Sequence, residues 1–157
     1  MIGTIAKETK DRDNRARNIV IQGIPKSSDI DTTAQKTHDQ TAIVKILDLI
    51  GADKTKVISH FRLTPRDATK TGPIIVTLPD EKERNNVLKL SNTHFRTPTN
   101  RTANAAIFIN PDMIQSEKNL AWQLRTECKK RNSALPNTAT TVYVIRGNQI
   151  KEITKTY

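Results

Sequence analysis

The stretch that decides the fold is Gly72-Pro73-Ile74-Ile75-Val76-Thr77-Leu78-Pro79-Asp80-Glu81-Lys82-Glu83-Arg84-Asn85-Asn86-Val87-Leu88. Its β-branched apolar run lies between two prolines, which predicts a short strand buried on at least one face. Asp80 then offers a carboxylate to the free N–H groups of a following helix, and Glu83 stands three residues further on. Because the strand turns directly into this helix, the helix must fold back over its own sheet.

Three more apolar runs predict strands around this unit, at residues 18–25, 57–63 and 105–109. With the helices, the order becomes strand, helix, strand, strand, helix, strand. This order predicts an α+β, ferredoxin-like fold, in which a split βαβ arrangement forms a four-stranded antiparallel sheet with both helices on one face. The other face is left open, and the open face of a small sheet is a natural binding platform.

The first helix is predicted from an apolar stripe at helical spacing, made of Ile43, Ile46, Leu47 and Ile50. Gly51 follows where a left-handed residue would end the helix. Thr37 and Gln40 have the spacing of a capping box at its start. Residues 26–36 are predicted to form a polar loop, and residues 91–103 a mobile connection.

A second, smaller part follows the sheet. Asp112 is predicted to cap a helix that runs to about Arg131, and residues 140–146 and 149–153 are predicted to form a β-hairpin with a glycine-containing turn. The chain is therefore divided into three segments: residues 1–17, a polar lead-in or the end of a coiled coil; residues 18–111, the sheet domain; and residues 112–157, a small C-terminal domain.

The strongest compositional signal is the net charge of +10 over 157 residues. Residues 1–80 carry 13 basic and 10 acidic side chains, whereas residues 81–157 carry 13 and 6. An uneven basic excess concentrates anions near the surface, and nucleic acid is the commonest such partner. The other interpretation of the charge is solubility alone.

The composition also argues against several classes of protein. Cys128 is the only cysteine, which excludes an intramolecular disulfide and predicts a reducing compartment. No apolar run approaches the roughly 20 residues of a membrane span, so no membrane partner is predicted. The charged start of the chain does not resemble a secretory signal.

No catalytic constellation is present in the sequence. The three histidines, His38, His60 and His94, have no metal-ligand spacing with one another or with Cys128. Neither a dinucleotide-binding nor a P-loop glycine motif occurs. We therefore predict a protein that is not an enzyme and has no cofactor, metal ion or small-molecule substrate.

The open sheet is predicted to bind nucleic acid without aromatic stacking. RNA-recognition modules with this topology stack bases on rings of the first and third strands. Here those strands read Ile19-Val20-Ile21 and Ile74-Ile75-Val76-Thr77, without a ring. Arg and Lys contacts to phosphates must then supply the affinity, which predicts sequence-tolerant, salt-sensitive binding.

The candidate nucleic-acid-binding residues lie on loops, at the ends of predicted strands and on predicted helices, chiefly the C-terminal helix. They are Arg17, Arg62, Arg66, Lys70, Lys89, Arg96, Arg101, Lys118, Trp122, Arg125, Lys129, Lys130, Arg131 and Arg146. On the helix, Lys118, Trp122, Arg125 and Lys129 recur on one side. An indole among cations can stack on an unpaired base, but a ring packed into the core is equally compatible with the sequence.

Several segments, in this order and spacing, resemble the first open reading frame protein of non-LTR (LINE-type) retrotransposons. They are Arg17-Asn18-Ile19-Val20-Ile21-Gln22-Gly23-Ile24-Pro25, Phe61-Arg62-Leu63-Thr64-Pro65-Arg66, Pro73-Ile74-Ile75-Val76, Arg84-Asn85-Asn86-Val87-Leu88-Lys89 and Ile107-Phe108-Ile109-Asn110-Pro111-Asp112-Met113. The likeness covers about residues 15–153.

The resemblance implies a non-enzymatic protein that coats the RNA of its element and acts as a nucleic-acid chaperone. It implies an RNA-recognition-like domain, a small C-terminal domain and self-association through a coiled coil that ends in or before residues 1–17. It also implies a cytoplasmic ribonucleoprotein, with the nucleus as a second location, and single-stranded RNA or DNA as partner. The chain departs from the family pattern at Thr77 and Asn92, where relatives carry basic residues, whereas Arg62, Arg66 and Lys89 match basic positions.

A different class of function fits the same pattern. In this alternative the sheet docks a protein partner, the charge serves solubility, and nucleic acid has no role. The two hypotheses differ in what loss of the basic residues on the C-terminal helix would do to RNA binding.

Overall fold

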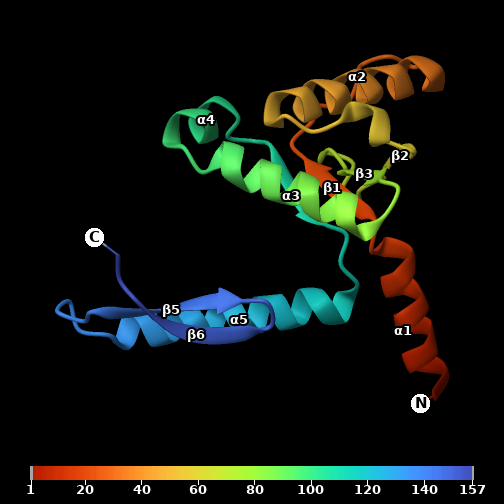
Figure 1. The fold of residues 1–157 in the computed structure, drawn as a ribbon. Coiled ribbons are helices and arrows are strands. Elements are labelled where there is room, and N and C mark those ends of the chain that lie inside the picture. The colour runs from red at the N-terminus through yellow and green to blue at the C-terminus, as the bar shows by residue number, and fades with distance from the viewer. Residues whose placement is uncertain (1, 157) are drawn as a thin grey trace. The chain divides into compact units, whose positions relative to one another are not determined.

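The computed structural model describes residues 2–156, which divide into two compact units between Asp112 and Met113 (Figure 1). The first unit contains the four-stranded sheet and its helices, and the second contains one helix and a β-hairpin. The division falls one residue after the boundary that the sequence suggested. Each unit has its own packing and is described separately.

A four-stranded antiparallel sheet organises the first unit. Its strands are β1 (Asn18–Gln22), β2 (Ser59–Arg62), β3 (Ile74–Thr77) and β4 (Phe108–Pro111), in the spatial order β2-β3-β1-β4. The register pairs Ile19 with Val76, and Ile21 with both Ile74 and Ile109. The predicted α+β fold with an antiparallel four-stranded sheet is confirmed, although β2 is shorter than expected and β4 begins later.

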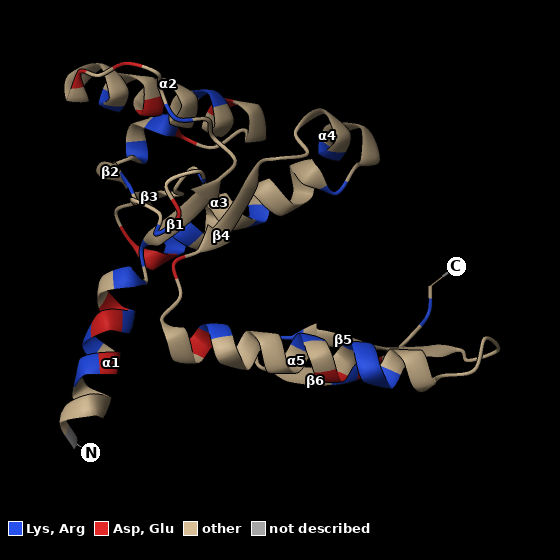
Figure 2. Cartoon of the chain, turned by 180° about the vertical axis from the view of Figure 1, so that it is seen from behind, with Lys and Arg blue, Asp and Glu red and all other residues tan. Residues whose placement is uncertain are grey.

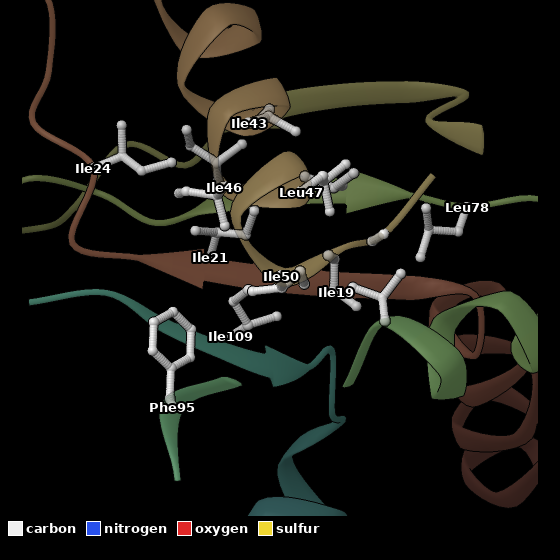
Figure 3. Close-up of a cluster of buried hydrophobic side chains, with 14 residues drawn as sticks. Ile19, Ile21, Ile24, Ile43, Ile46, Leu47, Ile50, Leu78, Phe95 and Ile109 are labelled. Carbon is white, nitrogen blue, oxygen red and sulfur yellow. The ribbon is translucent and has the colours of Figure 1, made fainter. Parts of the chain in front are cut away.

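One face of this sheet carries the hydrophobic core. Helices α2 (Thr32–Ile50) and α3 (Glu81–Phe95) both contribute buried side chains to it. Figure 3 shows Ile43 and Leu47 of α2 beside Ile19 and Ile21 of β1, all of them buried. Burial of each such side chain stabilises the fold by about 1.5–3 kcal/mol. The helical stripe and the alternation of the strands therefore meet in one core.

The stretch from Gly72 onward forms the predicted strand, turn and helix. The carboxylate of Asp80 accepts the backbone N–H of Glu83 at 2.8 Å, which caps α3. Gly72 is needed for a reason that the sequence did not show: a Cβ at this position would overlap the backbone carbonyl of Leu63. The loop between β2 and β3 therefore closes tightly on itself just before β3.

Helix α2 begins earlier than predicted. Asp31, rather than Thr37, is its N-cap, and its carboxylate accepts the backbone N–H of Thr33 at 3.3 Å. Thr37 instead donates its hydroxyl to the Thr33 carbonyl one turn back, so the capping box assigned to it is wrong. The predicted end is confirmed, because Gly51 is left-handed with φ of 78°.

The remaining elements of the first unit are α1 (Ile2–Arg15), the short 3-10 helix η1 (Lys54–Lys56) and α4 (Pro98–Ala103). Much of the region expected to be a mobile connection is helical, because α3 continues to the buried ring of Phe95 and Pro98 opens α4. Proline is well suited to the first turn of a helix, where its missing N–H is not needed.

The second unit packs helix α5 (Gln115–Ala134) on a hairpin of β5 (Thr141–Arg146) and β6 (Gln149–Thr154). The hairpin turns at Gly147, which has φ of 59°. Asp112 does not cap α5, contrary to the prediction. Its carboxylate instead accepts bonds from Asn18 at 3.1 Å and Arg15 at 3.4 Å, within the first unit.

Candidate nucleic-acid interface

Arg62, one of the predicted phosphate-binding residues, is built into the first unit. Its guanidinium forms an ion pair with Asp39 at 2.6 Å, and the two side chains are only 12% and 9% exposed. It also donates to the backbone carbonyls of Ile24, Pro25 and Gly72. With both Asp39 oxygens these bonds occupy all five N–H donors of the guanidinium, so none remains for a phosphate. The assignment of Arg62 to nucleic-acid binding is therefore corrected to a structural role.

Arg101 is likewise held inside the first unit. Its guanidinium lies between two rings, 4.7 Å from the centroid of Phe95 and 4.6 Å from that of Phe108. It also donates to the backbone carbonyls of Asn104 and Ile107. These contacts tie α4 to the start of β4, so we remove Arg101 as well from the set of phosphate ligands.

The open face of the sheet carries two aromatic rings. Phe61 pairs with Ile75, whose neighbours Ile74 and Val76 point into the core, and Phe108 pairs with Gln22. Phe61 and Phe108 therefore lie on the face opposite the core, 54% and 47% exposed. The expectation that this face lacks rings is wrong, because it considered only the central strands. The rings lie on the two outer strands, and these strands are three strand spacings or about 14 Å apart.

Helix α5 presents a row of exposed cations with an indole among them. Lys118, Trp122, Arg125 and Lys129 are all exposed and follow one side of the helix, and Trp122 is 62% exposed. Basic residues recur along the helix in Figure 2. The structure thus answers the question that the sequence left open, since the indole is at the surface and not in the core. Over these residues the helix advances about 16 Å.

The hairpin is locked to this helix by Asn132. Its side-chain amide donates to the Tyr143 carbonyl and accepts the Tyr143 N–H, both at 2.8 Å, as a neighbouring strand would. The buried thiol of Cys128 donates to the same carbonyl at 3.2 Å. A shallow groove beside this contact is lined by Arg125, Lys129 and Ile145, among others. These hydrogen bonds fix helix α5 against the hairpin.

Arg131 differs from its neighbours on α5. Its guanidinium pairs with Glu127 at 3.0 Å and lies 5.6 Å from the ring centroid of Tyr143. Although the side chain is partly exposed, these contacts direct it toward the hairpin. Among the basic residues of α5, Lys118, Arg125 and Lys129 are therefore better placed to meet a ligand.

The remaining predicted residues are exposed and lie on several different elements of the two units. They are Arg17, Arg66, Lys70, Lys89, Arg96, Lys130 and Arg146. Within residues 2–156, none of these side chains forms an ion pair. Lys70 stands out because it lines a cavity of the first unit.

The described residues include no cluster of metal-binding side chains. Across residues 2–156, no group of three or more His, Cys, Asp or Glu side chains is placed to hold a metal ion. The lowered pKa values of Asp53 and Asp67 follow chiefly from hydrogen bonds to Thr55 and Thr69 in exposed turns. In the same part of the chain, no helix has the length and apolar character needed to cross a bilayer.

No protein-family model matches the chain, and a search of curated proteins finds no match either.

Proposed function

We propose that this chain is a non-enzymatic protein that binds single-stranded nucleic acid, mainly through phosphate contacts, with a chaperone-like role in a ribonucleoprotein. The observation that carries the proposal is the exposed row of Lys118, Trp122, Arg125 and Lys129 on α5. Three cations and a solvent-exposed indole on one helix side supply both of the contacts that a flexible single strand can use.

The chemistry of this row predicts how binding should behave. Each neutralised phosphate of a single strand releases counterions and contributes about −0.7 to the log–log salt slope. A base stacked on Trp122 adds about 1–3 kcal/mol, with little preference among bases because every base has a π-face. Binding should therefore be salt-sensitive and sequence-tolerant, as a chaperone-like role requires.

The first unit supports the same proposal through its topology. The strand order β2-β3-β1-β4, with α2 and α3 packed on one face, agrees with a ferredoxin-like arrangement of the kind found in RNA-recognition modules. Phe61 and Phe108 give its open face two rings on the outer strands. We propose that they add stacking contacts at the edges of the sheet, Phe108 through the ring face that Arg101 does not cover.

The element order also supports the proposed kinship with first open reading frame proteins of LINE-type retrotransposons. A sheet unit followed by a helix–hairpin unit is the organisation that the resemblance implies. On this proposal the partner is RNA or single-stranded DNA in the cytoplasm and nucleus, and self-association occurs through a coiled coil that ends in or before residues 1–17. Several copies in one assembly would raise avidity without new contacts.

The test replaces Lys118, Arg125 and Lys129 together with alanine in the full chain. Arg131 is left in place because it contacts Glu127 and Tyr143. We expect affinity for a single-stranded oligonucleotide to fall about tenfold or more, and the magnitude of the log–log salt slope to fall by about 2, from three phosphate contacts. Filter binding over a range of salt concentrations measures both.

The matched control removes the same charge from the first unit, at the exposed lysines Lys45, Lys56 and Lys82. This variant should keep most of the affinity and slope of the original chain. Equal losses in both variants would show that only net charge matters. Unchanged binding in the α5 variant would refute the proposed interface, and a salt slope near zero in the original chain would favour a protein-interaction module.

A further inference from the structure

A cavity of about 490 Å³ lies in the first unit, between the first turns of α2, strand β2 and the loop of residues 63–72. Its volume falls in the range of about 300–1,000 Å³ that small-molecule sites usually have. None of its lining residues belongs to α5 or to the hairpin. The cavity therefore shares no residue with the interface on the second unit.

The lining of the cavity is strongly cationic. Lys26, Lys36 and Lys70 come from three different segments and are all exposed. Within residues 2–156 none of their ammonium groups forms an ion pair. The only carboxylate in the lining is that of Asp39, which is already paired with Arg62. These five charged residues give the lining a net charge of +3, which favours an anion.

The pKa of His60, which lines the same cavity, is lowered, as a positively charged lining would favour. Burial lowers the pKa of the imidazole, and the positive charge of Lys36 lowers it further, against a smaller opposing effect of Asp39. The ring is also engaged by Gln40, with Nε2 at 2.7 Å from the amide oxygen. The positive charge of Lys36 therefore affects His60, another residue of the cavity lining.

The cavity also has apolar surface. Leu63, Pro65 and Ala68 line it, together with part of Phe61. Thr32 and Thr64 add hydroxyl groups that can accept or donate a hydrogen bond. A lining that combines unpaired cations with apolar surface suits a ligand that carries both an anionic group and a flat apolar group.

We propose that this cavity binds one nucleotide unit of a single strand. Lys26, Lys36 and Lys70 hold the phosphate, and the base packs against Leu63 and Pro65. The choice of a nucleotide rests on the proposed nucleic-acid function, but the site uses none of the residues of α5. The site gives the sheet unit a contact to nucleic acid that needs no aromatic ring on the central strands β1 and β3.

The experiment titrates the full chain with adenosine 5′-monophosphate, adenosine and inorganic phosphate, and follows the backbone amides by NMR. One variant replaces Lys26, Lys36 and Lys70 with glutamine. Its matched control replaces Lys45, Lys56 and Lys82 with glutamine, which are exposed and line no part of the cavity. A third variant, Ala68→Trp, fills the cavity without any change of charge.

We expect the nucleotide to bind and to shift the amides of His60 and Ala68. Its affinity should fall at least tenfold in the cavity lysine variant and in Ala68→Trp, but less than twofold in the control. Adenosine and inorganic phosphate should each bind at least tenfold more weakly than the nucleotide. The proposal is overturned by no binding at millimolar nucleotide, by equal losses in cavity and control variants, or by phosphate binding as tightly as the nucleotide.

The two proposals fail in different ways. If the cavity is correct, the variant at Lys118, Arg125 and Lys129 keeps its affinity for the mononucleotide whatever happens to its affinity for an oligonucleotide. If only the interface on α5 is correct, that variant loses oligonucleotide binding while the mononucleotide shifts no amide of the cavity.

Discussion

Replacement of Asp39 by alanine would leave the guanidinium of Arg62 buried without its carboxylate. In the structure the two side chains are 12% and 9% exposed, and two charge-assisted hydrogen bonds of 2.6 and 3.1 Å join them. Removal of one partner from such a buried pair costs about 3–5 kcal/mol, because the remaining charge keeps its desolvation penalty. A typical domain is stable by only about 5–15 kcal/mol, so the loss should be large.

Urea denaturation of the full chain measures this loss. The single tryptophan and both tyrosines lie after residue 112, so intrinsic fluorescence follows the second unit alone. Far-UV circular dichroism follows the helices of both units. With an m-value of about 1.5 kcal/mol/M, we expect the midpoint of the first unit to fall by about 2–3 M, while the fluorescence midpoint stays in place.

The matched control is Asp48→Ala, on the same helix. Asp48 pairs with Lys54 at 3.2 Å, but these side chains are 54% and 50% exposed. Loss of such a surface pair costs less than about 1 kcal/mol. If Asp39→Ala were no more destabilising than Asp48→Ala, the structural role of Arg62 would be refuted, and the residue would again be a candidate phosphate ligand.

Three further variants test other parts of the molecule. Trp122→Ala should weaken oligonucleotide binding roughly 5- to 150-fold without a change in salt slope, since a stacked ring is worth about 1–3 kcal/mol and carries no charge; unchanged affinity would exclude stacking. Asn132→Ala removes two hydrogen bonds to β5 and should destabilise the second unit by about 2–3 kcal/mol in fluorescence-monitored urea unfolding, with a loss under 0.5 kcal/mol as the contrary result. Gly23→Ala should destabilise the first unit by more than about 1 kcal/mol, because φ is 94° and a Cβ would overlap the Ala106 carbonyl. Gly51→Ala, with φ of 78° and open space around it, should cost less, and equal losses would show that strain alone matters.

In the candidate site, residue types alone do not predict which basic side chains are available to a ligand. Arg62 and Arg101 look like phosphate ligands in the sequence. The fold surrounds Arg62 with acceptors from distant segments, and it places Arg101 against the rings of Phe95 and Phe108, which are nearby in the chain. Asp39 lies 23 residues before Arg62 in the chain, and nothing in the local sequence marks them as partners. The lysine row of α5, by contrast, follows from helical spacing alone, and the structure leaves it exposed.

The aromatic rings of the sheet illustrate the same limit. In a strand over residues 57–63, side chains alternate between the two faces. This alternation correctly places Phe61 on one face and His60 and Arg62 on the other. Which of the two faces is covered, however, depends on the pairing with β3 and on the helices that pack there. The sequence alone does not single out Lys26 and Lys36, which lie on either side of the first turn of α2. The cavity that they line exists only once β2 and its loop are folded against that helix.

The sequence by itself determined the strand between Pro73 and Pro79, the cap at Asp80, the end of α2 at Gly51 and the antiparallel sheet. The strand and the helix ends depend on interactions between residues close in the chain, and the sheet follows from the order and the periodicity of the elements. Only the tertiary structure decided which cations are free. A charge becomes structural when distant segments bring acceptors to it, as they do to Arg62, and it remains available when its helix side faces solvent, as at Lys118 and Lys129.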